Sequence, residues 1–161
     1  MYVISLFICD SVRGMMNYLD TVDITEAHES QCVEFKEASF ELPKDVWETY
    51  SAFANTEGGE IFLGISGDGK DQSFSITGVM DSQSIITAFW NKVRNPQEVS
   101  RDIMLKDGVY TIEKEGKEIV VISVPRAERG DKPVSVYDKK NKWVSWVRRG
   151  TGDYKALSLI H

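Results

Sequence analysis

The pattern of apolar and polar positions predicts a strand, a helix and a hairpin in the first half of the chain. Alternation over residues 33–38 indicates a short strand. A helix follows, with Pro43 in its first turn and the Gly58-Gly59 pair ending it. An apolar run predicts a buried strand over residues 60–66, and a loop over residues 67–72 leads into a partner strand over residues 73–79. The apolar stripe of the helix consists of Val46, Trp47, Tyr50, Phe53 and Ala54.

The second half is predicted to contain one helix followed by strands. Asp81 is a good N-cap for this helix, and Asn95-Pro96 stops it. Its apolar stripe consists of Ile85, Ile86, Phe89, Trp90 and Val93. The predicted strands are residues 109–114, 118–124, 133–137 and 143–148, with a tight turn at residues 115–117 and another at 138–142.

Two helices and mostly hairpin-linked strands indicate an α+β fold, with a mixed, largely antiparallel sheet and both helices on one face. The 161 residues are 42% hydrophobic and 27% charged, as in one soluble globular domain. We expect this domain to span residues 26–161 and residues 1–25 to form an N-terminal extension. The apolar residues 1–9 are far fewer than the roughly 20 that span a bilayer, so we expect no membrane contact and a cytoplasmic protein.

Cysteine and histidine usage excludes several classes of chemistry. Cys9 and Cys32 show no CxxC spacing, which supports neither a zinc cage nor a disulfide framework, so we expect reduced thiols in or near the core. With only His28 and His161, a multi-histidine metal site is not expected. No Walker-type loop is present, so the sequence does not predict ATP binding. Acid–base or metal chemistry here would have to use carboxylates, lysine or serine.

Charge is distributed unevenly along the chain. The formal net charge is -6, which argues against non-specific coating of nucleic acid. The last 36 residues nevertheless carry 9 basic and 4 acidic side chains, a formal charge of +5. This asymmetry is typical of a face that binds a polyanion, although a solvated basic hairpin without a partner explains it equally well.

Four sequence blocks are more specific than these patterns. They are ESQCVEFKEAS at residues 29–39, SAFANTEGG at 51–59, IFLGI at 61–65 and VRRGTG at 147–152. In this order and spacing the blocks resemble the Schlafen-type AlbA domain, over roughly residues 26–157. The resemblance implies a nucleic-acid-binding module, found in many prokaryotic proteins as the front end of a longer transcriptional regulator. We expect this chain to be either a short stand-alone member or a part of such a regulator.

The C-terminal hairpin is the candidate nucleic-acid-binding element. Alternation along residues 143–148 puts Trp143 on one face and Trp146 on the other, so one tryptophan can face the core while the other stacks on a base. Cations at both ends of the hairpin would grip phosphates. The alternative is that both tryptophans pack in the core and the lysines keep the turn soluble. The candidate residues are Arg148, Arg149, Lys139, Lys140, Lys142 and Trp146.

The resemblance extends to vertebrate Schlafen proteins that cleave transfer RNA with two glutamates and an aspartate. The matching E-x4-E-x-K pattern puts the two glutamates on Glu29 and Glu34, and Asp68 is the nearest acid to the third position, displaced along the chain. Three such carboxylates would bind Mg²⁺ or Mn²⁺. Lys36, on the same strand face as Glu34, would orient water or stabilise the phosphorane. These residues are equally compatible with ordinary strand and turn positions.

Three functions therefore remain as sequence interpretations. The first is a regulatory nucleic-acid-binding module for DNA or RNA, without catalysis of its own. The second is a metal-dependent endoribonuclease acting on transfer or ribosomal RNA through Glu29, Glu34 and Asp68, which are both the catalytic and the metal residues, with Lys36. The third is a protein-interaction domain whose acidic first half binds a basic partner. Because vertebrate relatives use two copies of the domain, a comparable groove here would need a homodimer.

Overall fold

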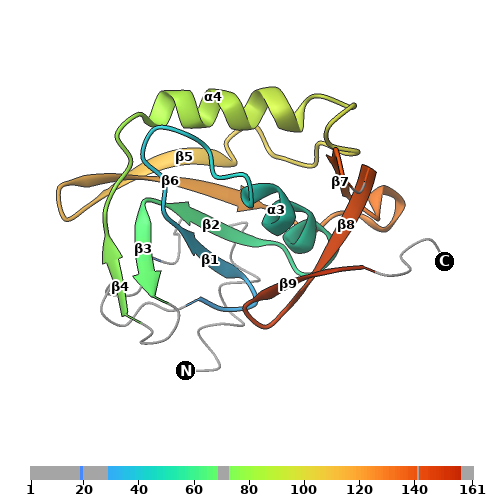
Figure 1. Ribbon diagram of the computed structural model, residues 1–161, viewed down its shortest axis with the longest axis horizontal. Helices are drawn as coiled ribbons and strands as arrows, with labels where there is room; N and C mark the ends of the chain where they lie inside the picture. The colour runs from blue at the N-terminus through green and yellow to red at the C-terminus, as the bar shows by residue number, and fades with distance from the viewer. Residues whose placement is uncertain (1–18, 20–28, 69–72, 141, 157–161) are drawn as a thin grey trace.

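The computed structural model describes residue 19 and residues 29–68, 73–140 and 142–156. A four-stranded sheet lies at the centre of this part of the chain (Figure 1). Its strand order is β1 (Val33–Lys36), β2 (Gly59–Leu63), β6 (Lys117–Val124) and β5 (Val109–Lys114). β1 and β2 run parallel, whereas the other two pairs are antiparallel. The mixed, largely antiparallel character expected from the sequence is confirmed.

Both helices pack on one face of the central sheet, as the sequence predicted. α3 (Val46–Asn55) and α4 (Ser82–Val93) share a buried cluster with the side chains of Ile61 and Leu63 from β2. Trp47 of α3 stacks on Phe89 of α4, with ring centroids 5.1 Å apart and planes 9° from parallel. The predicted N-cap is also confirmed, because Asp81 accepts a hydrogen bond from the Ser84 N–H at 3.1 Å.

The opposite face of the central sheet is covered by a hairpin of β3 (Ile65–Asp68) and β4 (Ser73–Ile76). Phe62 and Val121 from the sheet pack there against Ile65, Ile76 and Leu19. β2 is therefore buried on both faces, which explains why the sequence reads as a continuous apolar run instead of an alternating one.

Two element boundaries differ from the sequence prediction. Residues 60–66 are not one strand, because Gly64 takes a φ of +110° that only glycine adopts readily, and the chain turns there from β2 into β3. α3 begins at Val46, not at Pro43. Pro43 lies in the preceding turn, where its carbonyl accepts a hydrogen bond from the Val46 N–H at 3.2 Å.

A separate three-stranded antiparallel sheet follows, made of β7 (Ser135–Asp138), β8 (Lys142–Arg149) and β9 (Gly152–Lys155). The sequence predicted the pairing of β7 with β8 but not β9. In Figure 1 this sheet lies beside α3, and the contacts between α3 and β8 join it to the rest of the molecule. α3 therefore packs between the central sheet and this smaller sheet.

The N-terminal part of the chain lies mostly outside the described residues. This holds for the predicted extension over residues 1–25 apart from Leu19, and for Cys9. Cys32 is buried and disulfide-bonded, so the expectation of a reduced thiol at this position is wrong. In the described part of the chain no helix is long and apolar enough to cross a membrane.

Candidate nucleic-acid interface and its supporting ion pairs

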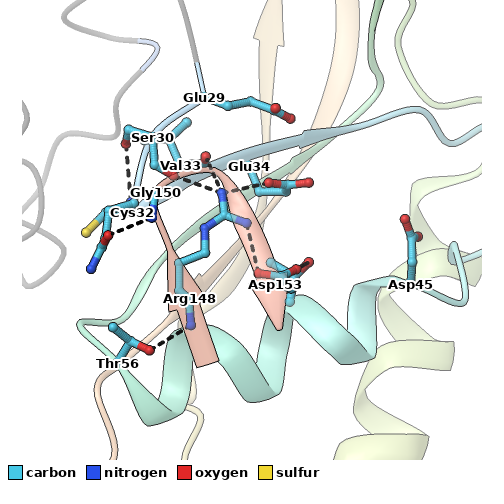
Figure 2. A network of polar contacts seen from close by, with 12 residues as sticks. Glu29, Ser30, Cys32, Val33, Glu34, Asp45, Thr56, Arg148, Gly150 and Asp153 are labelled. Atoms are coloured by element: carbon cyan, nitrogen blue, oxygen red, sulfur yellow. Dashed lines mark hydrogen bonds and ion pairs between the residues drawn. The ribbon is translucent and has the colours of Figure 1, made fainter. Parts of the chain in front are cut away.

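Arg148 lies inside the protein, between two carboxylates from distant parts of the chain. Its side chain is only 1% exposed. Nη2 donates to Oε2 of Glu34 at 2.7 Å, and Nη1 donates to Oδ1 of Asp153 at 2.9 Å (Figure 2). Asp153 also accepts a hydrogen bond from the Thr49 hydroxyl at 2.7 Å. The guanidinium thereby connects β1, β8, β9 and α3.

Two backbone carbonyls also accept from this guanidinium, whereas its buried Nε has no hydrogen-bond partner among the described residues. Nη2 also donates to the carbonyl oxygens of Ser30 at 2.8 Å and Val33 at 3.2 Å. The group stands 5.0 Å from the centroid of the Phe53 ring. A guanidinium with this many charged and polar partners is a structural group. Arg148 is therefore not at the exposed surface where the sequence interpretation put it, and we leave it out of the interface.

Glu34 and Lys36 lie on the same face of β1, as the sequence predicted. The Lys36 ammonium stands 3.4 Å from Oε1 of Glu34 and 3.0 Å from Oδ2 of Asp45. Both oxygens of Glu34 thus have a cationic partner, Lys36 on one and Arg148 on the other. The Glu34 carboxylate belongs to an internal ion-pair network.

Glu29 lies next to this network and is half-buried. Its Oε1 accepts a hydrogen bond from the Phe35 N–H at 3.1 Å. Burial raises the pKa of the Glu29 carboxyl above its usual 4.5, and the negative charge of Glu34 raises it further. The hydrogen bond from Phe35 and the positive charges of Arg148 and Lys36 lower this pKa, but they do not cancel the increase. The folded protein therefore holds this proton more tightly than the unfolded chain does.

This raised pKa predicts a pH-dependent effect of Glu29→Gln. A carboxyl whose pKa is higher in the folded than in the unfolded state destabilises the fold once it ionises. The free energy of unfolding therefore falls as the pH rises from below 4.5 through the folded-state pKa of Glu29. Glutamine keeps the acceptor for Phe35 but never ionises. We expect the variant to unfold at a higher urea concentration than wild type at pH 7, and at the wild-type concentration at pH 4. An equal shift at both pH values would contradict this explanation.

The structure describes the side chains of Glu29 and Glu34, two of the three carboxylates expected to bind a divalent metal. Within the described part of the chain there is no group of three histidine, cysteine or acidic side chains that could hold a metal ion. Asp68 ends β3, paired with Ser73, and its side chain lies outside what the structure describes. Because Glu34 is already bound by two cations, we derive no reaction step through Mg²⁺ or Mn²⁺.

The exposed tryptophan is Trp143 and not Trp146, which corrects the assignment made from the sequence. The Trp146 side chain packs against the main core cluster. The backbone N–H of Trp146 donates to the Ser51 hydroxyl, and its backbone carbonyl accepts from the Asn55 amide of α3. Trp143 is 47% exposed. Alternation along β8 was correct, but it could not show which face meets α3.

Trp143 lies on an outward-facing surface of the β7–β9 sheet whose full set of residues the sequence did not predict. The register places Tyr137 opposite Trp143 and Tyr154 opposite Val147, and directly opposed residues share a face. Tyr137 and Tyr154 are 42% and 53% exposed. We call this outer surface of β7, β8 and β9 the aromatic face; it comprises Tyr137, Trp143, Ser145, Val147 and Tyr154.

Exposed cations flank the aromatic face at both ends. Lys139, Lys140 and Lys142 lie in and beside the turn between β7 and β8, and Arg149 lies at the other end of β8. All of these cations are exposed. Within the described residues none of them forms an ion pair with an acidic side chain, so their charge is available to a ligand.

Comparison with known proteins places the fold in a family. The family model described as Schlafen, AlbA_2 matches residues 29–157. The chain belongs to the Schlafen AlbA_2 family. The four sequence blocks therefore mark this domain, and the structure shows what one of them does. Asn55, from the SAFANTEGG block, accepts from the Val134 N–H and donates to the carbonyls of Val134 and Trp146.

Two solved structures share the fold of this Schlafen AlbA_2 domain. One is the N-terminal domain of a RecG-related protein from Nitrosomonas europaea, with a TM-score of 0.59, 22% identity, and coverage of 96% of this chain and 95% of that chain. The other is the DIP2311 protein from Corynebacterium diphtheriae, with a TM-score of 0.52, 18% identity, and coverage of 86% of this chain but 25% of that chain. No curated protein matches the sequence.

Proposed function

We propose that this Schlafen AlbA_2 domain is a nucleic-acid-binding module with a regulatory role. The observation that carries the proposal is the aromatic face with four exposed cations at its two ends, on a segment whose formal charge is +5. Lysine and arginine neutralise phosphates and release counterions, which supplies most of the affinity of such modules. Family membership and the fold shared with a domain of a RecG-related protein are consistent with this assignment.

A reduced dependence of binding on salt is expected when the cations are removed. Replacing Lys139, Lys140 and Lys142 together with alanine should weaken binding of a labelled oligonucleotide. The slope of log K against log salt should become shallower by about 0.7–0.9 for each phosphate that the protein no longer neutralises. Fluorescence anisotropy between about 50 and 200 mM salt measures both quantities.

Two variants that each remove one exposed cation give the matched control for this experiment. Arg149→Ala removes one exposed cation at the edge of the aromatic face, whereas Lys106→Ala removes one exposed cation from the loop before β5. We expect weaker binding and a shallower slope for Arg149→Ala and wild-type values for Lys106→Ala. Equal effects of the two substitutions would mean that only net charge matters, and would contradict a site on this sheet.

Cleavage is tested on the same samples with structured RNA, using Mg²⁺ or Mn²⁺ and a chelator. The informative variant is Glu29→Gln, because Glu34 carries an ion pair of the fold and its loss would perturb structure as well as chemistry. Binding without metal-dependent cleavage is the expected result. Cleavage that disappears in Glu29→Gln would instead establish the endoribonuclease, and absence of binding to any nucleic acid would favour a protein partner.

A further inference from the structure

The exposed aromatic side chains are concentrated on one small surface. In the described part of the chain the exposed aromatic residues are Phe40, Tyr137, Trp143 and Tyr154. All but Phe40 lie on the aromatic face of a sheet whose β7 and β9 strands have only four residues each. Exposed apolar side chains that gather in one patch mark binding surfaces. Flat rings on a strand surface are the platforms on which nucleic-acid bases stack.

The rings are spaced along β8 so that more than one base could be accommodated. Tyr137 and Trp143 form an edge-to-face pair, with centroids 5.6 Å apart and planes at 68°. Tyr154 lies opposite Val147, four residues further along β8, which corresponds to about 13 Å of strand. An edge-to-face pair leaves ring surface uncovered, so bases can stack at both positions.

The distribution of charge matches a strand laid along this row of rings. Lys139, Lys140 and Lys142 lie beyond the Tyr137–Trp143 pair, and Arg149 lies near the β9 end of the face. Backbone phosphates would meet these cations while bases lie on the rings. The aromatic part of the surface has few charges of its own, since Ser145 and Val147 occupy the positions between the rings.

We propose that the ligand of the aromatic face is single-stranded nucleic acid, bound by stacking of unpaired bases on Trp143 and Tyr154. This inference rests on the proposed nucleic-acid-binding function and specifies its substrate class. A duplex keeps its bases stacked inside and presents phosphates to a protein, so rings on a sheet surface gain little from it. Single-stranded DNA and RNA offer the same ring faces, and the test includes both.

The test compares oligonucleotides of one sequence as single strands and as duplexes, in DNA and RNA form. Wild type should bind the single strands more tightly than the duplexes and lose tryptophan fluorescence on binding. Trp143→Ala and Tyr154→Ala should each weaken single-strand binding by roughly five- to a hundredfold, the usual loss for one stacked base, and leave the weak duplex binding unchanged. Trp143→Phe and Tyr154→Phe should keep most of the affinity, because stacking needs a ring and not its polar group.

Control variants separate failure of this inference from failure of the proposed function. Phe40→Ala removes an exposed ring from another part of the surface, and we expect wild-type binding from it. Equal affinity for duplex and single strand, or undiminished binding by both alanine variants, would overturn the stacking site while the nucleic-acid-binding function stood. Absence of binding to every oligonucleotide at low salt would overturn both. Circular dichroism of Trp143→Phe and Trp143→Ala confirms that the variants are folded.

Discussion

Replacement of Arg148 with alanine is expected to lower the free energy of unfolding by about 3–5 kcal/mol, the usual cost of removing one partner of a buried ion pair. The substitution removes the cation shared by Glu34 and Asp153, whose side chains are 14% and 12% exposed. It also removes the donor to the carbonyls of Ser30 and Val33. Two poorly hydrated carboxylates then remain without their strongest partner, so the folded state loses more than one interaction.

The neighbouring residue supplies the control for this measurement. Arg149 is exposed at the end of the same strand, so Arg149→Ala should change the free energy of unfolding by less than about 0.5 kcal/mol. The loss of unfolding free energy for Arg148→Lys should fall between these two values, because a lysine ammonium cannot bind both carboxylates with the geometry of the planar guanidinium. Urea unfolding followed by far-UV circular dichroism gives the three values. Similar, small effects of Arg148→Ala and Arg149→Ala would show that the buried ion pairs contribute little.

The role of Arg148 changes how a substitution at Glu34 must be interpreted. An endoribonuclease site predicts a stable but inactive Glu34→Ala protein, whereas the ion pair at 2.7 Å predicts a less stable one. Loss of activity in that variant would therefore not identify a catalytic group by itself. Glu29 is the better probe of chemistry in this region, because its removal is expected to leave the fold intact.

The parts of the fold that sequence patterns predicted are those determined by short-range regularity. The apolar stripe of α4 and its Asp81 cap were both confirmed, because each depends on neighbours three or four residues away. β9 was missed because its four residues, GDYK, contain neither alternation nor strand-forming runs. In the structure β9 pairs with β8, and Arg148 and Asp153 form an ion pair between the two strands.

The site was predicted less well than the fold because its contacts are distant in sequence. The alternation of side chains along β1 correctly placed Glu34 beside Lys36. No local pattern shows that Arg148, 114 positions away, donates to the other carboxylate oxygen of Glu34. The alternation of side chains along β8 put Trp143 and Trp146 on opposite faces, but only the packing of α3 against β8 determines which of the two is exposed. Basic residues near a family motif are therefore weak evidence of a surface site unless their burial is known.

Removal of the Asn55 side chain is expected to loosen the attachment of the β7–β9 sheet to the rest of the domain. Asn55 accepts from the Val134 N–H at 2.8 Å and donates to the carbonyls of Val134 at 3.0 Å and Trp146 at 2.9 Å. Asn55→Ala removes the partner of the Val134 N–H and of the Trp146 carbonyl, whereas the Val134 carbonyl still accepts from the Ser51 hydroxyl at 2.7 Å. We expect a loss of about 2–6 kcal/mol in the free energy of unfolding, given about 1–3 kcal/mol for each of the two groups that lose this partner.

Two further variants distinguish the loss of these hydrogen bonds from other causes. Asn55→Asp keeps the acceptor for Val134 but sets a carboxylate oxygen against two carbonyl oxygens, so it should be at least as destabilising as alanine. Asn91→Ala removes an exposed asparagine from α4 and should stay within about 0.5 kcal/mol of wild type. Because β8 also carries Trp143, the Asn55 variants should bind single strands more weakly at temperatures where they remain mostly folded. Destabilised variants with wild-type affinity would show that the aromatic face keeps its shape without this attachment.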